Sequence, residues 1–315
     1  MTGMRLSTRT RFSAGIVALA LVVGLSACST EETENPKASN GISITVGSQG
    51  TTENEIIAQI YGQALAFEGY EIDYNPGVGS RKQYMKALTD GIVDFIPEYS
   101  GNFLNYLDRS LRYTTTESMV SVMPDLLEKR KLQVLEASPA HNGYSLVVTK
   151  AFSQEHNLVN IGDLSNVAAS ISIGATPEFE GLSYGRNGLA SVYGVAGWRF
   201  DSIDDETGTE VIQALIDDKI QVAGVHASTS ALVDKDLVVL GDPSKIIAEQ
   251  NVLPLVRTDI ASGPFTRLVN SVSAELTTED LQQLNHLSAT STHSAESLAR
   301  DWLQDHGFLG SEPTS

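Results

Sequence analysis

Cysteine is almost absent from the sequence: the 315 residues include one, Cys28. A single cysteine cannot form an intramolecular disulfide, so the folded part depends on its hydrophobic core and not on covalent cross-links. The length exceeds that of a typical single core and favours two lobes. The content of hydrophobic residues, 41%, and of charged residues, 19%, is ordinary for a globular protein.

Basic residues are scarce as well. Lys and Arg number 21 against 39 Asp and Glu, which gives a formal net charge of -18 at pH 7. Proteins that bind nucleic acid need basic patches for the phosphate backbone, so the composition disfavours this class of function.

The motifs of common enzymes are also missing. His226 and Ser228 are close in sequence, but no G-x-S-x-G elbow surrounds them. The six histidines show no H-E-x-x-H or similar spacing, so we expect no metal and no cofactor. The sequence therefore argues against an enzyme. An exported hydrolase on a two-lobe α/β scaffold remains the alternative from this class.

Long hydrophobic runs are confined to the N-terminus, where FSAGIVALALVVGL follows three arginines and precedes Leu25-Ser26-Ala27-Cys28. We interpret residues 1–27 as a secretory signal peptide. Its end resembles a bacterial lipobox, which implies cleavage before Cys28 and lipid attachment to that sulfur. An uncleaved membrane anchor is the first alternative, but the run is short for a span of about 20 residues. A plain signal peptide, the second, leaves the position of the only cysteine unexplained.

The polar residues 28–40, STEETENPKASN after the cysteine, predict a flexible tether between the membrane and the folded part. Beyond it, apolar patterns of period 2 and period 3.6 predict an α/β chain. We expect strands at 42–46, 71–75, 92–96, 132–135, 144–149, 171–173, 222–225 and 237–240. We expect helices near 52–65, 80–90, 103–131, 182–193, 210–216, 263–272, 278–289 and 294–305.

The order of these elements predicts two α/β lobes joined by two crossings. We place the first crossing near 136–142 and the return near 241–255. Lobe 1 then comprises 41–138 and 250–315, and lobe 2 comprises 139–249. Loops at strand ends and two crossings predict a hinged ligand cleft, since ligands of open α/β sheets bind where strands end.

One stretch carries a resemblance to a known family. Residues 77–102, GVGSRKQYMKALTDGIVDFIPEYSGN, contain G-S-R, A-L-x-x-G-x-(I/V)-D and E-Y-S-G in that order. They resemble the substrate-binding subunits of ABC importers for glycine betaine, choline and related osmoprotectants. Collinear matches follow the same family pattern at Gly47-Ser48-Gln49 with Thr52-Glu53, at Gly174 to Phe179 and at Asp236 to Leu240.

The resemblance implies a type II periplasmic-binding-protein fold and a role outside the cytoplasm. A lipid-anchored monomer would capture glycine betaine, choline, carnitine or proline betaine and deliver it to a permease and its ATPase. The chain itself has no G-x-x-x-x-G-K-(S/T) motif and no second long apolar span, so it is neither the ATPase nor the channel subunit. A binding protein for another small polar or cationic metabolite stays open.

The family holds its quaternary ammonium group with aromatic rings, by cation–π attraction of about 0.5–2 kcal/mol per ring. Tyr99 matches the tyrosine of the E-Y-S-G motif. Tyr144 stands where the family places another ring, after the first crossing, and Asn142 matches an asparagine of the same segment. Alternatively, Tyr99 and Tyr144 pack on the core, and Asn142 stabilises the backbone of the crossing instead of contacting the ligand.

Four positions depart from the family pattern or vary within it. His226 and Gln250 stand where aromatic rings are expected, Asn102 replaces a threonine or aspartate, and Gln49 takes a position of lysine or glutamine. The pocket is therefore expected to be less aromatic and richer in amides than a dedicated betaine cage. This hypothesis predicts weak binding of glycine betaine, or preference for a solute with more hydrogen-bonding groups.

Three further polar residues have two interpretations each. Ser80 and its helix N-terminus could receive a ligand carboxylate, or Ser80 could be a plain N-cap. Glu178 could contact a cation from lobe 2, or could favour the N-terminus of the next helix. Arg81 is expected to be a surface or interlobe charge.

Overall fold

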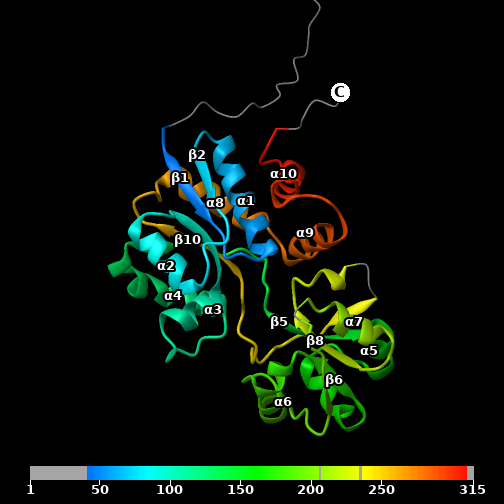
Figure 1. Cartoon of the computed structure of the whole chain (residues 1–315). Helices are drawn as coiled ribbons and strands as arrows, with labels where there is room; N and C mark the ends of the chain where they lie inside the picture. Colours follow the sequence, from blue (N-terminus) through cyan, green and yellow to red (C-terminus); the bar gives the residue numbers. More distant parts are fainter. Residues whose placement is uncertain (1–40, 206, 234–235, 311–315) are drawn as a thin grey trace, which may run out of the picture. The chain divides into compact units, whose positions relative to one another are not determined.

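The computed structural model describes residues 41–310 except 206 and 234–235, and the strands of this part form two sheets (Figure 1). The predicted signal peptide and tether, residues 1–40, lie outside the described residues. In the order β2-β1-β3-β10-β4, the first sheet contains β1 (Ser43–Gly47), β2 (Glu71–Asn75), β3 (Phe95–Tyr99), β4 (Leu132–Val134) and β10 (Val252–Arg257).

The second sheet lies between β4 and β10 in the chain. In the order β7-β6-β8-β5-β9, it contains β5 (Tyr144–Thr149), β6 (Ser172–Ala175), β7 (Arg199–Ser202), β8 (Val222–His226) and β9 (Leu237–Val239). The strands of each sheet fall inside the ranges expected for one lobe. The edges of the two lobes stay a prediction.

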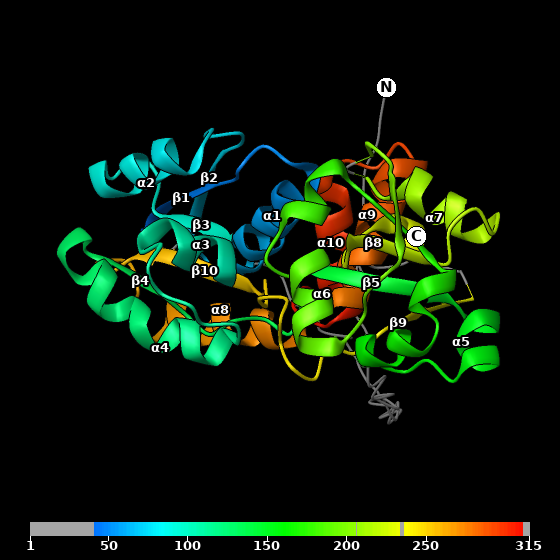
Figure 2. The same ribbon diagram turned by 90° about the horizontal axis from the view of Figure 1, so that it is seen from below.

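Both sheets are mixed and have the same topology: one strand is antiparallel to its two neighbours, and the other pairs are parallel. In the first sheet, β1 is parallel to β2 and β3, whereas β10 is antiparallel to β3 and β4. In the second, β6 is parallel to β7 and β8, whereas β5 is antiparallel to β8 and β9. Figure 2 shows β10 beside β3. The chain therefore leaves the first sheet after β4 and returns into its interior.

Helices cover both sheets. Those of the first lobe are α1 (Thr52–Phe67), α2 (Arg81–Asp90), α3 (Ser100–Leu107), α4 (Thr116–Leu127), α8 (Gly263–Glu275), α9 (Thr278–Thr290) and α10 (Ala295–Asp305), with the 3-10 turn η1 (Glu128–Arg130). Those of the second are α5 (Lys150–His156), α6 (Arg186–Tyr193), α7 (Thr209–Ile216) and the 3-10 turns η2 (Ile161–Asn166), η3 (Ala168–Ser170), η4 (Pro177–Gly181) and η5 (Ser230–Leu232). No helix in the described ranges is long and apolar enough to span a bilayer.

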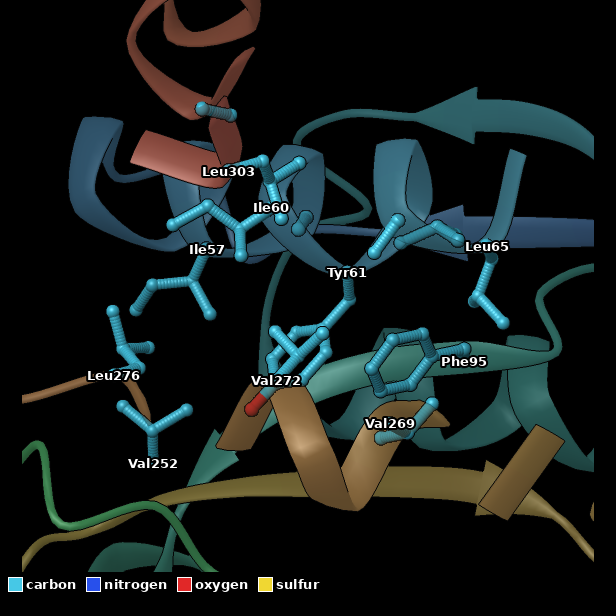
Figure 3. Packing of buried hydrophobic residues seen from close by; sticks show 14 of the residues in the cluster. Ile57, Ile60, Tyr61, Leu65, Phe95, Val252, Val269, Val272, Leu276 and Leu303 are labelled. Carbon is cyan, nitrogen blue, oxygen red and sulfur yellow. The ribbon is translucent and has the colours of Figure 1, made fainter. Parts of the chain in front are cut away.

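The first lobe is built around α1, whose apolar stripe is buried between the sheet, α8 and the C-terminal helices (Figure 3). Tyr61 of α1 lies edge-on to Phe95 of β3, with ring centroids 5.1 Å apart. Its hydroxyl is 2.9 Å from Ser273 Oγ, so the one polar atom of this ring is paired. This packing fixes the middle of α1 against the start of β3, and the site begins at the other end of that strand.

Several predicted boundaries were wrong. The strand expected at 92–96 is β3, which begins three residues later and includes Pro97, the residue expected to stop it. Proline is tolerated here because β1 pairs with β3 only at Phe95, so no partner strand needs a donor from Pro97. On the other side, Pro97 faces Pro254 of β10.

The return crossing ends earlier than predicted, because β10 begins at Val252. The helical stretch expected at 103–131 is two helices, α3 and α4. The helix expected at 182–193 begins only at Arg186, after the turn η4. The helix α5 and the strand β7 were not predicted. Both are short and partly exposed, which leaves a weak apolar pattern.

Candidate functional site

A cavity of about 390 Å³ lies on the second lobe, at the ends of β6 and β8. Its wall includes Tyr144, Glu178 and His226, three of the residues singled out from the sequence. Since β6 and β8 are parallel, they end at one edge of the sheet, and antiparallel β5 begins there. Tyr144 and His226 are direct partners in this register. The remaining wall is formed by Thr176, Asp205, Gly208, Gly224 and Val225.

Aromatic rings gather around Tyr144. Its ring stacks on Phe179, with centroids 5.2 Å apart and planes at 18°, and His226 meets it edge-on at 5.5 Å. Tyr184 lies 5.8 Å away. Burial raises the pKa of Tyr184 to about 12 and also raises that of Tyr144, so both phenols are neutral. The Tyr144 hydroxyl donates to the carbonyl of Gly224 at 2.8 Å, which leaves the ring as its contribution to the cavity.

Two carboxylates border the same cavity. Glu178 is exposed, and the ion pairs of the described residues do not include it. Burial by itself would raise the pKa of Asp205, but hydrogen bonds from Thr207 and from the backbone of Glu210 outweigh it and hold the pKa below its usual value. The rings are therefore bordered by negative charge, which suits a cation.

On the first lobe, Tyr99 ends β3 and its hydroxyl donates to Glu53 in the first turn of α1. Asn142 Nδ2 donates to the same Glu53 oxygen at 2.9 Å. Burial, and next the Glu53 carboxylate, raise the pKa of Tyr99 well above its usual value, so the phenol stays a donor. The Tyr99 ring packs against the first-lobe core. In the sequence, Glu53 is marked only as the neighbour of Thr52 in a segment that resembles the family.

Gln49, after β1, is fixed by the end of β3. Its Nε2 donates to the Pro97 carbonyl and to Glu98 Oε2, both at 3.2 Å. Glu98 is fully buried and accepts from Nε and Nη2 of Arg81, at 2.9 Å each, and from the Tyr84 hydroxyl. Burial raises the pKa of Glu98, and the Arg81 guanidinium works against this shift. Arg81 was expected on the surface or between lobes. It is instead the partner of a buried carboxylate.

Ser80 bonds within its own helix, and Asn102 bonds to the return crossing. The N–H and hydroxyl of Ser80 both donate to Gln83 Oε1, at 2.8 and 2.6 Å, as an N-cap of α2 would. Asn102 and Gln250 bond each other: the Asn102 N–H donates to Gln250 Oε1 at 2.9 Å. A Cβ at Gly101 would lie 2.7 Å from Gln250 Nε2 and from the Glu249 carbonyl, so this close approach requires the glycine of E-Y-S-G.

The two crossings run side by side and bring the parts of the site together. The N–H of Val252 donates to the Ala140 carbonyl, and the N–H of Asn142 donates to the Gln250 carbonyl, at 2.9 Å each. His226 Nδ1 lies 3.1 Å from the Asn142 carbonyl oxygen. The cavity residues of the second lobe and the Tyr99 group of the first thus meet at Asn142.

Of the predicted residues, Tyr144, Glu178 and His226 line one cavity. Tyr99 and Asn142 both donate hydrogen bonds to Glu53. Gln49, Ser80 and Asn102 are bonded to other neighbours. The sequence does not single out Glu53, Phe179, Tyr184 or Asn285 as site residues, although Glu53 and Phe179 both stand in the segments that resemble the family. In the described ranges, no group of three or more His, Cys, Asp or Glu residues could hold a metal ion.

Comparisons with known proteins give one family and one fold. The family model "Substrate binding domain of ABC-type glycine betaine transport system" matches residues 42–305. The glycine-betaine-binding protein of Pseudomonas aeruginosa is 25% identical over 278 residues, which cover 84% of this chain and 88% of that protein. The glycine betaine-binding protein YehZ of Escherichia coli is 24% identical over 278 residues, which cover 84% of this chain and 91% of that protein.

Solved structures share the fold. Apo YehZ from Escherichia coli superposes with a TM-score of 0.73 at 22% identity, covering 84% of this chain and 99% of that chain. A crystal structure described as a glycine betaine/carnitine/choline ABC transporter superposes with a TM-score of 0.77 at 17% identity, covering 85% and 98%. The fold is therefore the two-lobe, type II periplasmic-binding-protein fold that the sequence predicted.

Proposed function

Because the chain belongs to the family of substrate-binding domains of ABC-type glycine betaine transport systems, we propose that its solute is a small quaternary ammonium compound. A member of this family is an extracytoplasmic solute-binding protein that delivers its solute to a permease and is not an enzyme. The hydrolase alternative is thereby set aside. Glycine betaine, which the names of two relatives state, is the first candidate, with choline, carnitine and proline betaine.

The aromatic cavity of the second lobe carries this proposal. Rings of Tyr144 and His226 and the carboxylates of Glu178 and Asp205 face one space of about 390 Å³, within the range of small-molecule pockets. A trimethylammonium group cannot donate a strong hydrogen bond, so ring faces and negative charge suit it better than amides do. Glu178 would thus have a role toward a cation in addition to its place in the first turn of η4.

The rest of the solute would lie toward the first lobe. We propose that Gln49, Ser80, Asn102 and Asn142 offer polar contacts there, and that the Tyr99 ring adds an apolar face. None of the four carries a charge. A ligand carboxylate would therefore meet amide and hydroxyl donors only, which supports the expectation of weak glycine betaine binding.

A comparison of charged and neutral solutes tests the proposal. Choline and its neutral isostere 3,3-dimethylbutan-1-ol have the same shape and differ in the positive charge, which the rings and the carboxylates of Glu178 and Asp205 would attract. Thermal shift should show about 2.7 kcal/mol of stabilisation at 100 times the dissociation constant. The isostere should bind less tightly by about 0.5–2 kcal/mol per ring. Equal binding of the two solutes, or no shift with any quaternary amine, would contradict the proposal.

Two variants of one residue sharpen this test. Tyr144→Phe should keep most of the affinity, since the hydroxyl is bonded to Gly224 and not aimed at the solute. Tyr144→Ala removes the ring and should weaken choline binding about 2- to 30-fold. Tyr113→Ala, at an exposed tyrosine of the first lobe, is the matched control. If Tyr144→Ala binds as the control does, the cavity is not the ammonium site.

We further propose that the mature protein is a monomer anchored by lipid on Cys28, a residue outside the described ranges. The lipobox-like sequence supports this. Cys28→Ser should move the protein from the membrane fraction to the soluble fraction when cells that express it are broken and fractionated. The affinity for choline should not change. Retention of the variant in the membrane fraction would favour an uncleaved anchor.

A further inference from the structure

Glu53 is a junction of three hydrogen bonds from three distant parts of the chain. Its Oε1 accepts from the Tyr99 hydroxyl of β3 and from Asn142 Nδ2 of the first crossing. Its Oε2 accepts from Asn285 Nδ2 of α9 at 2.5 Å. All three partners are neutral, and the ion pairs within the described ranges do not include Glu53.

The helix α9 extends this junction to the second lobe. Asn285 Nδ2 also donates to the Ser228 carbonyl at 2.9 Å, and Gln282 Nε2 donates to the Ala227 carbonyl at 2.7 Å. Gln282 and Asn285 are three residues apart and so lie on one face of the helix. The two carbonyls are consecutive and follow directly after His226. A first-lobe helix therefore holds the loop that carries a ring of the cavity.

Asn142 provides a second connection between Glu53 and His226. Its carbonyl oxygen lies 3.1 Å from His226 Nδ1, while its side-chain amide donates to Glu53. The other amide atom, Asn142 Oδ1, is buried without a hydrogen-bond partner among the described residues. An unpaired buried acceptor is costly. The bond to Glu53 therefore sets the orientation of this amide even at that cost.

We infer that Glu53 is a positioning residue of the solute site. It fixes the Tyr99 ring on the first lobe and, through Asn285 and Asn142, the His226 loop on the second. Three donors converge on it, and a carboxylate, which only accepts, can serve all of them. Glutamine has the same size but would turn its own amide protons toward one of the donors. The effect on affinity rests on the proposed function, whereas the effect on the loop does not.

Hydrogen exchange of the solute-free protein tests the loop directly. Glu53→Gln, Asn285→Ala and Gln282→Ala should each speed exchange of the backbone amides in 226–230 about 10-fold. Glu55→Gln, in the same turn of α1, and Gln283→Ala, exposed on α9, should leave it unchanged. Unchanged exchange in Asn285→Ala and Gln282→Ala would overturn the inference. These two variants carry the test even if Glu53→Gln folds poorly.

Titration with choline and with glycine betaine tests the consequence for binding. Glu53→Gln and Asn285→Ala should each weaken affinity about 10-fold, and the double variant should lose little more, because both changes cut one path. If the losses of binding free energy in the two single variants add up in the double variant, Glu53 and Asn285 act independently. That result would contradict a shared path through both residues. If neither solute binds the unaltered protein, the proposed function fails, while faster exchange of 226–230 would still support the positioning role.

Discussion

At the scale of single residues, the Arg81–Glu98 ion pair next to the site is already satisfied within the protein. Arg81 is matched by Glu98, which also holds Gln49 and accepts from the Tyr99 N–H at 3.1 Å. Taking a carboxylate out of water is costly unless a cation and hydrogen bonds replace the water. This pair therefore orders the end of β3 without offering charge to a solute.

The Arg81–Glu98 pair predicts an asymmetric effect on stability. Arg81→Met would leave the fully buried Glu98 carboxylate without its cation and should lower the free energy of unfolding by about 3–5 kcal/mol. Lys86→Met, on the same helix, breaks an exposed pair with Asp90 and should cost at most about 1 kcal/mol. Urea denaturation of both variants measures the difference, and similar losses would show that the buried pair contributes little.

Which site residues the sequence predicts depends on how local their signal is. Tyr144, Glu178 and His226 each lie in a segment with its own pattern, at a strand end, and the structure brings them to one cavity. Glu53 stands beside Thr52 in one family match, but this does not indicate a role, since an acid in the first turn of a helix is common for its favourable interaction with the helix dipole. Its partners are 46, 89 and 232 residues away, so only the folded chain shows its role.

At the scale of elements, local patterns identified most helices and strands but not every boundary. The helix expected near 278–289 is α9, and its predicted start is confirmed, because Thr277 and Asp280 form a capping box directly before Thr278. The limits of β3 were wrong because apolar residues alone marked them. Pairing with β10 extends the strand through Pro97 and Glu98, and the sequence around β3 carries no sign of a partner at 252–257.

At the scale of the whole molecule, the two lobes follow from two repeats of one α/β plan. Length and element order were enough to predict them. The interlobe path through α9 was not predictable, because it joins side-chain amides to backbone carbonyls, and a carbonyl is present at every residue. The sequence shows what each lobe is made of, and the structure shows how Asn285 and Gln282 connect them.

The place of β10 has a consequence for how the protein matures. This strand lies between β3 and β4 but is made after the entire second sheet, so the first sheet cannot be completed until residue 257 is available. The strands of the second sheet are contiguous in the chain and need no such late partner. We therefore expect lobe 2 to fold first.

A chain that ends at residue 250 should show protected amides in β5, β6 and β8 by hydrogen exchange, but not in β3 and β4. Protection of β3 in that chain would contradict the expected order. Folding from the second lobe to the first would make the Tyr99 side of the site the last to form, so an exported chain would become able to capture solute only after nearly all of it had crossed the membrane.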